Sequence, residues 1–343
     1  MSVTSYDILN TILDNASDLY ISRVPEATRN NLKQVGDAIT SDSNIMNEFI
    51  TTLVNKIVYS NVVSKMFINP LAKLKKSNAR PYGSTIEEIF INPATDVGYD
   101  NDGNKLLKTT KPDGKTAYYG LNRKSSYPVS IDKEVLLRAF QSDSEFMSMY
   151  EGIVSSLYSG DNIDEFNLMK GLFGKAIDEG AMKVIESDLA SPKDLAKTIS
   201  KNSQLFAFPN TEYNGYNLVN ATKISSGETK CITYCDVKDQ VLLVRADVQT
   251  EIDYEVLASY FHIDKLKLQQ MTIPVDYFPS TKYDVYAVLC DQNAIQVRDT
   301  TFEIATQYIG SSLKWNFWLH HWQFLFLSMF GNCLAFAKTK ATV

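Results

Sequence analysis

The residues with the chemistry of metal ligands are the four cysteines and the three histidines. Structural zinc sites use Cys and His side chains that usually come in closely spaced pairs. Cys231 and Cys235 make a loose C-x3-C pair, and no second close pair accompanies them. Cys290 and His262 would have to complete such a site from elsewhere in the chain. We therefore predict no metal and no cofactor, and we interpret the cysteines as small, half-buried thiols.

Acidic clusters suggest a second kind of chemistry, as general acids and bases or as calcium ligands. Asp100, Asp102 and Asn104 resemble the opening of a calcium loop. The glycine falls at the fourth position, where an EF-hand requires it at the sixth, and the twelfth position holds no glutamate. The sequence also lacks a P-loop, a G-x-G-x-x-G motif and a G-x-S-x-G motif. We predict that the protein is not an enzyme.

Positive charge is concentrated between Phe49 and Ile86, a stretch with six Lys or Arg residues and no acidic one. One interpretation is a solvated face, and the other is a surface that meets an acidic neighbour or phosphate. The formal net charge of the whole chain is -6. A general basic field for binding nucleic acid is therefore excluded, and any such contact has to be local.

The stretch from Trp315 to Ala337 contains no Asp, Glu, Lys or Arg. It reaches the roughly 18 residues of a membrane span, but polar side chains are spread through it and would then face lipid. Near its start Trp318, His320 and Trp322 fall on one face of an alternating pattern and His321 on the other. Alternation of this kind is typical of a strand. We predict a buried strand and no membrane anchor.

Residues 92–129 are poor in aliphatic side chains and contain the turn dipeptides Asp102-Gly103 and Asp113-Gly114. Such a segment cannot bury a core of its own. It is therefore predicted to project as an extended, twisted hairpin or loop that contacts another molecule. The first 55 residues hold two short amphipathic pieces around a polar stretch, and we expect an arm with little core of its own.

Helical periodicity begins after Ser142, which forms a capping box with Glu145. We expect a first helix that stops at Gly160 and a second that is capped by Asp161 and ends near Gly180. The remaining elements that the pattern predicts are a third helix from Ser191-Pro192, strands at 240–247 and 284–291, and a short helix at 253–261.

Composition places these elements in a globular α+β protein. The 343 residues are 44% hydrophobic and 22% charged, which allows one elaborated domain or two lobes. The few, irregularly spaced cysteines suit a reducing compartment. The N-terminus shows neither a basic n-region nor an apolar h-region, so we expect a cytosolic product.

Six stretches, in this order, resemble the major capsid proteins of small podophages of the phi-twenty-nine type. They are PEATRNNLKQVGDAI (25–39), NEFITTLVNKI (47–57), NPLAKLKK (69–76), STIEEIF (84–90), DYEVLASYF (253–261) and LKWNFWLHHWQFLFLSMFGNCLAF (313–336). The resemblance implies the fold shared by tailed-bacteriophage and herpesvirus shells. It implies an N-terminal arm at 1–60, an extended hairpin region at 61–131, spine helices with part of the peripheral domain at 132–200, an axial domain at 201–280, and completion of the peripheral domain at 281–343.

The function that the resemblance implies is a shell protein that is assembled in the host cytoplasm into pentamers and hexamers and encloses double-stranded DNA in a virion. Expected partners are other copies of the chain, a scaffolding protein, a portal and, non-specifically, the packaged DNA. A shell subunit has to overlap its neighbours through projecting segments. Our candidates for subunit contact are Lys73, Lys75, Lys76, Arg80, Lys105, Lys108, Lys111 and Arg123.

Three other readings stay open at this point. A connector or tail protein would also lack catalytic motifs and expose adhesive loops. A two-lobed cytosolic enzyme could use scattered acids such as Asp247, Asp253 and Asp291. A membrane protein would be anchored by residues 315–337.

Overall fold

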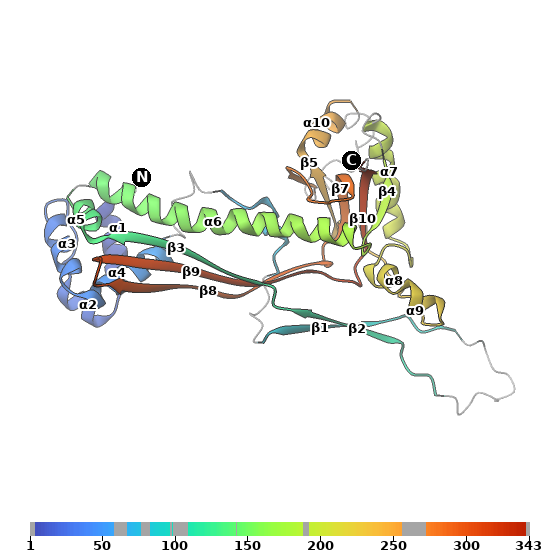
Figure 1. Ribbon diagram of the computed structural model, residues 1–343, viewed down its shortest axis with the longest axis horizontal. Coiled ribbons are helices and arrows are strands. Elements are labelled where there is room, and N and C mark those ends of the chain that lie inside the picture. Colours follow the sequence, from blue (N-terminus) through green and yellow to red (C-terminus); the bar gives the residue numbers. More distant parts are fainter. Residues whose placement is uncertain are drawn as a thin grey trace. The chain divides into compact units, whose positions relative to one another are not determined.

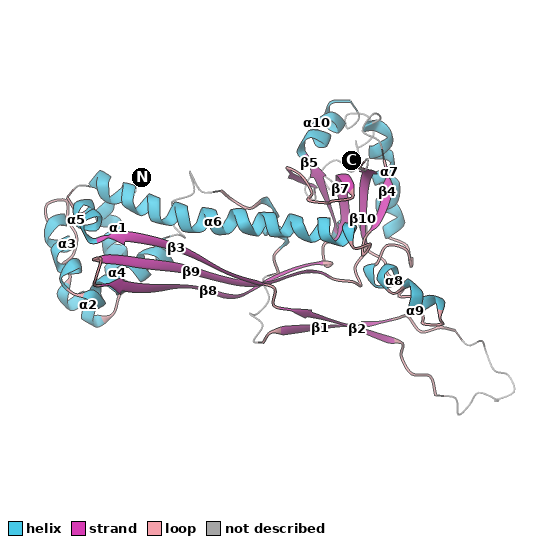
Figure 2. Ribbon diagram, in the orientation of Figure 1, coloured by secondary structure: helices cyan, strands magenta, loops and turns pink. Residues whose placement is uncertain are grey.

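The computed structural model describes residues 4–57, 67–76, 83–96, 98, 109–141, 143–187, 192–255 and 272–340. The chain forms two compact units, and each is made of three separate stretches. Unit 1 consists of Met1–Asn69, Arg123–Glu165 and Asp299–Gln323, and unit 2 consists of Pro70–Asn122, Phe166–Arg298 and Phe324–Val343. Both units combine helices with strands, which confirms the predicted α+β class (Figures 1 and 2).

Unit 1 begins with a group of short helices. They are α1 (Ser5–Leu13), α2 (Asp18–Arg23), α3 (Leu32–Ser41) and α4 (Ser43–Ile57), and α5 (Lys133–Ala139) joins them from later in the chain. Thr4 and Asp7 form a capping box at the start of α1, and the Ser17 side chain accepts a hydrogen bond from the Tyr20 backbone at the start of α2. Local capping signals therefore set where these two helices begin.

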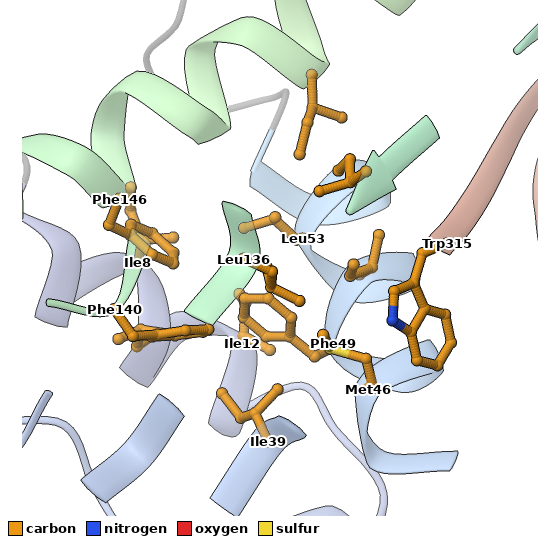
Figure 3. Close-up of a cluster of buried hydrophobic side chains, with 14 of the residues drawn as sticks. Ile8, Ile12, Ile39, Met46, Phe49, Leu53, Leu136, Phe140, Phe146 and Trp315 are labelled. Atoms are coloured by element: carbon orange, nitrogen blue, oxygen red, sulfur yellow. The ribbon is translucent and has the colours of Figure 1, made fainter. Parts of the chain in front are cut away.

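These helices share one hydrophobic core (Figure 3). Ile12 and Phe49 are fully buried in it, and the Phe49 ring centroid lies 5.8 Å from that of Phe140 and 6.4 Å from that of Phe146. The apolar side chains of the N-terminal helices are therefore buried in a core that they share with α5, α6, β3 and β9. Each helix alone carries only a narrow apolar stripe, but several helices packed together join their stripes into a closed interior.

A three-stranded sheet of order β3-β9-β8 completes unit 1. It contains β3 (Arg123–Asp132) and the parts of β8 (Ile295–Ile309) and β9 (Lys314–Leu327) that lie in this unit. β3 and β9 are antiparallel, with Arg123 opposite Gln323 and Asp132 opposite Lys314. Along β9 the buried residues alternate with less buried ones from Trp315 to His321. The predicted aromatic strand is thus confirmed, and among the described residues no helix is long and apolar enough to cross a membrane.

The long helix α6 (Asp143–Asp178) corrects the prediction of two helices divided at Gly160. A glycine inside a helix costs only about 1 kcal/mol relative to alanine, which tertiary packing can outweigh. Asp161, which we expected to be a cap, has its side chain bound to Arg123 and His321 from within the helix. The same helix then supplies Met169 and Phe173 to the core of unit 2.

Unit 2 is built on a five-stranded sheet of order β4-β10-β7-β5-β6. Its strands are β4 (Lys183–Glu186), β10 (Cys333–Thr339), β7 (Tyr283–Asp291), β5 (Gln240–Arg245) and β6 (Thr272–Val275). β7 runs antiparallel to both β10 and β5, whereas β4 pairs with β10 and β6 with β5 in parallel. The predicted strands at 240–247 and 284–291 are confirmed as the neighbours β5 and β7.

Helices cover both faces of this sheet, so its central strands are buried on each side. The C-terminal part of α6 packs on one face, and α7 (Pro192–Phe206) with α10 (Ala246–Glu255) packs on the other. The third predicted helix is α7, which starts at Pro192. α10 covers only the start of the helix predicted at 253–261, and the rest lies outside the described residues. β7 pairs with β10 on one side and with β5 on the other, so strands from both sides of residue 281 belong to one sheet of unit 2.

The remaining elements of unit 2 are short: the 3-10 turns Pro70–Leu74 and Val237–Asp239, the helices α8 (Gly215–Val219) and α9 (Ala221–Ser225), and the antiparallel pair β1 (Thr85–Ile91) and β2 (Gly114–Gly120). We call this pair the ribbon. It differs from the hairpin predicted at 92–129, because Asp113-Gly114 opens β2 instead of forming a turn and residues 123–132 leave to pair with β9. Asp102-Gly103 lies outside the described residues.

A close approach of backbones in unit 2 gives a sharp test of the α6 packing. A Cβ atom added to Gly174 would lie 2.0 Å from the carbonyl oxygen of Pro279. Gly174→Ala is expected to lower the unfolding free energy by about 1–3 kcal/mol through overpacking, measured by denaturant unfolding. Gly171→Ala is the matched control, because nothing lies within 4 Å of its added Cβ, and it is expected to be neutral or stabilising. Equal stability of the two variants would contradict this packing.

Candidate interaction surface

One face of the ribbon, which we call the inner face, packs against the rest of unit 2 through stacked aromatic rings. Tyr119 stacks on Phe326, with ring centroids 3.8 Å apart. Phe90 stacks on Phe330 at 5.3 Å, and Phe330 in turn stacks on Tyr216 at 5.4 Å. Alternation of side chains along a strand puts Phe90 and Tyr119 on the same face of the ribbon. The ribbon is therefore held by one of its two faces.

Hydrogen bonds fix the end of the ribbon at which Ile91 pairs with Gly114 to the segment that follows α9. The Asn92 side chain donates to Asp113 at 2.7 Å and to the Lys230 carbonyl at 3.0 Å, and it accepts from the Ile232 backbone at 3.0 Å. Hydrogen bonds from Thr229 and Asn92 hold the pKa of Asp113 below its usual range. This segment therefore orients the ribbon as well as anchoring it.

An ion pair adds to this anchorage. The Lys115 ammonium lies 3.1 Å from Glu228 and 3.3 Å from Asp113. Glu228 also accepts a hydrogen bond from the Tyr216 hydroxyl at 2.8 Å. The hydrogen bonds from Tyr216 and Lys115 lower the pKa of Glu228, so this carboxylate stays charged at neutral pH.

The outer face of the ribbon is apolar and exposed. Ile89, Ile91 and Tyr118 are 66%, 61% and 67% exposed. Ile89 lies opposite Thr116 and Ile91 opposite Gly114, so neither isoleucine is covered by a large side chain from the neighbouring strand. Glu87 accepts a hydrogen bond from the Tyr118 hydroxyl at 2.9 Å. Exposed apolar side chains gathered on one face of a fixed ribbon make that face a candidate for contact with another protein.

The basic residues that we selected from the sequence do not form one cluster in the described part of the chain. Lys73 is exposed on the turn Pro70–Leu74, and Lys111 is exposed just before β2. Lys76 is half-buried, and its ammonium donates to the Gln292 carbonyl at 3.1 Å and to the Asn293 side chain at 3.3 Å. Lys75 is half-buried beside it. Arg80, Lys105 and Lys108 lie outside the described residues.

Arg123 has an internal position that does not fit a role in subunit contact. It is 3% exposed, and its guanidinium donates to Asp161 at 2.6 Å, to the Tyr127 hydroxyl at 2.9 Å and to the Gln323 side chain. A charged hydrogen bond of this kind is strong because water is excluded. Arg123 is therefore a structural residue of unit 1, and its burial within the subunit argues against the predicted role in subunit contact.

Around Arg123 the structure brings together a set of polar residues that sequence reasoning missed, which we call the ion cluster; all are buried except Asp299, which is partly exposed. Its members are Arg123, Asp161, Glu165, Asp299, His321 and Gln323. They come from β3, α6, β8 and β9, so no local motif joins them. The one available signal was a histidine and a glutamine on the buried face of an otherwise apolar strand, since buried polar groups require partners.

By residue type, Glu165, Asp299 and His321 could hold a divalent metal ion, and their ligand atoms lie within 4.8 Å of one another. The Gln323 amide nitrogen, however, lies 2.5 Å from an oxygen of Glu165 and 2.5 Å from an oxygen of Asp299. The Asn69 amide donates to the other Glu165 oxygen at 2.8 Å. These hydrogen bonds already occupy the carboxylates, so we describe the group as a hydrogen-bonded ion cluster.

The cysteines considered as zinc ligands are free thiols, and all four are buried. Burial raises the pKa of Cys231 to about 11, which disfavours the thiolate that a metal requires. Cys290 and Cys333 lie opposite each other on β7 and β10. His262 lies outside the described residues.

Comparison with known proteins identifies the family. A family model described as Phi29-like phage major capsid protein matches residues 9–337. The major capsid protein of Bacillus phage B103 is 33% identical over 336 residues, which cover 97% of this chain and 72% of that protein. The major capsid protein of Streptococcus phage Cp-1 is 25% identical over 354 residues, which cover 96% of this chain and 93% of that protein.

Solved structures give the same result for the fold. The capsid structure of Staphylococcus phage Andhra matches with a TM-score of 0.64 and 14% identity, over 83% of this chain and 88% of that one. A major capsid protein is the repeated subunit of a shell, so membership of this family implies that the chain associates with itself. The family match over nearly the whole chain decides against a connector or tail component and against a two-lobed enzyme. The chain belongs to the Phi29-like phage major capsid protein family and is a structural component of the tailed-phage head.

Proposed function

We propose that the chain assembles into pentamers and hexamers through the outer face of the ribbon, which packs against a neighbouring copy in the shell. The observation that carries this proposal is the contrast between the two faces. One face is fixed by stacked rings, and the other presents Ile89, Ile91 and Tyr118 to solvent. An apolar surface held in a fixed orientation loses little conformational entropy when a partner covers it.

Rings of identical subunits require a contact between two different surfaces, because a head-to-tail arrangement has to continue from one copy to the next. The ribbon supplies one such surface. Its two isoleucines form a small apolar contact, which suits an assembly in which misplaced subunits must be able to leave before the shell closes. Further contacts then add stability as neighbours complete the ring.

We also propose that unit 2 contains the axial lobe, formed by its five-stranded sheet with α7 and α10, and that α6 is the spine. The order of the elements supports this in part. α6 lies within residues 132–200, and β5, α10 and β6 lie within 201–280, whereas β4, β7, β10 and most of α7 come from outside that range. Expected partners beyond the chain itself are a scaffolding protein, a portal and packaged double-stranded DNA. Lys73 and Lys111 are exposed cations that suit a local contact with an acidic neighbour or with phosphate.

Electron microscopy of the purified protein tests the proposed assembly, with and without a co-expressed scaffolding protein. We expect closed shells or sheets built of fivefold and sixfold rings under at least one of these conditions. Rings of a single fixed copy number, or dispersed monomers under both conditions, would contradict assembly into pentamers and hexamers.

The basic residues give a separate prediction. Replacing Lys73, Lys75 and Lys76 by glutamate is expected to leave the chain folded and to block assembly, because charge reversal turns attraction to an acidic neighbour into repulsion. Lys76 also donates hydrogen bonds within unit 2, so the single variant Lys73→Glu, at an exposed lysine, isolates the surface effect. Normal particles from this single variant, seen by electron microscopy, would show that Lys73 is not at a contact.

A further inference from the structure

His321 is placed so that both of its ring nitrogens face carboxylates. Its Nδ1 lies 2.8 Å from each oxygen of Asp161 on α6, and its Nε2 lies 3.1 Å from Asp299 on β8. The side chain is 3% exposed, whereas that of Asp299 is 35% exposed. A neutral imidazole carries only one N–H, so it could donate to only one of these two acceptors.

We propose that protonated His321 holds α6 and β8 together in unit 1. Its imidazolium donates hydrogen bonds to Asp161 on α6 and to Asp299 on β8, and loss of the proton breaks the bond to Asp299. The proton leaves from Nε2. Nδ1–H keeps its bond to Asp161, which is buried and also held by Arg123 at 2.6 Å. The Nε2 lone pair then faces the Asp299 carboxylate, and the attraction between them becomes repulsion.

The groups around the ring favour the protonated form. Asp161 and Glu165 face the cluster from α6, Asp299 from β8, and Arg123 from β3. Three carboxylates thus share one permanent cation, and the imidazolium supplies a second. Burial by itself lowers the pKa of His321, but hydrogen bonds to Asp161 and Asp299 more than offset it, so the pKa is raised above its ordinary value of 6.5.

The direction of the pH effect follows from this shift. A histidine whose pKa is higher in the folded state stabilises the fold fully below its unfolded pKa, and that stability is lost as the pH rises through the folded pKa. Unit 1 is therefore expected to weaken as the pH rises above 6.5 and through the folded pKa of His321. The three tryptophans report this selectively, since they are Trp315, Trp318 and Trp322, all on the part of β9 that lies in unit 1.

The test follows thermal unfolding of the full chain by tryptophan fluorescence from about pH 5.5 to about pH 9. Wild type is expected to lose roughly 2–4 °C more in melting temperature over this range than His321→Asn does. His320→Asn is the matched control, because His320 is the adjacent residue on the less buried face of β9, and it is expected to behave as wild type. An equal pH dependence of the melting temperature in wild type and His321→Asn would overturn the proposal.

A second measurement covers the case in which His321→Asn does not fold. NMR titration of the His321 ring in wild type and in Asp299→Asn is expected to give a folded pKa above 6.5 in wild type and a lower one in the variant. A wild-type value at or below 6.5 would overturn the proposal. So would stabilisation by added zinc at about pH 8 in wild type but not in Asp299→Asn, since a metal ion and not a proton would then occupy the site.

Discussion

Replacing Ile89 and Ile91 together by lysine is expected to leave the chain folded and to abolish shell assembly. Both side chains are more than half exposed and lie on the face of the ribbon opposite the stacked rings. The substitution therefore removes no internal contact described for the subunit. In an assembled shell it would bury two ammonium groups against an apolar surface, which is far more costly than the original contact.

Electron microscopy and circular dichroism of the same preparation separate assembly from folding in this variant. The control is Ile89→Val/Ile91→Val, which keeps the face apolar and the strand propensity high, and it is expected to form particles. Wild-type yields of closed shells from the lysine variant would show that the outer face of the ribbon is not a subunit contact. Loss of the folded spectrum would instead contradict the exposed position of the two side chains.

Arg123→Leu is expected to have the largest effect on the stability of unit 1. The guanidinium lies 2.6 Å from Asp161 and 3.9 Å from Glu165, and all three side chains are at least 94% buried. Removing the guanidinium leaves Asp161 with only the ring of His321 and Glu165 with only the amides of Gln323 and Asn69, and breaking a buried ion pair in this way typically costs about 3–5 kcal/mol. Denaturant unfolding followed by tryptophan fluorescence measures this loss.

Two further substitutions isolate the cause of that loss. Lys124→Leu removes a cation from the next residue of β3, which is exposed and lies 5.0 Å from the ring centroid of Trp322, and it is expected to lower stability by no more than about 1 kcal/mol. Arg123→Lys keeps the charge but cannot reproduce the planar fork of donors, so it is expected to fall between Arg123→Leu and wild type. If Arg123→Leu were as stable as Lys124→Leu, the ion cluster would not stabilise unit 1.

The aromatic strand could be predicted from the sequence because its signal is local. Alternate residues of β9 are buried from Trp315 to His321, and that period of two is visible in the letters. The division of α6 could not be predicted correctly for the opposite reason. Gly160 and Asp161 are ordinary signals for the end of one helix and the start of another, but a contact with Arg123 decides the role of Asp161.

The ion cluster and the inner face of the ribbon depend on contacts between distant parts of the chain. Arg123, Asp161 and His321 meet only because β3, α6 and β9 pack together. Tyr119 and Phe326 likewise stack across more than two hundred residues of sequence. The apolar outer face, by contrast, had a local signal that we did not use, because isoleucine at 89 and 91 alternates with the stacked Phe90.

A cryo-electron microscopy map of the assembled shell at side-chain resolution would show what covers the ribbon. We expect Ile89, Ile91 and Tyr118 of each copy to be covered by a neighbouring copy, while Phe90 and Tyr119 keep their contacts with Phe330 and Phe326. A closed shell in which the outer face of the ribbon still faces solvent would show that this face is not a subunit contact.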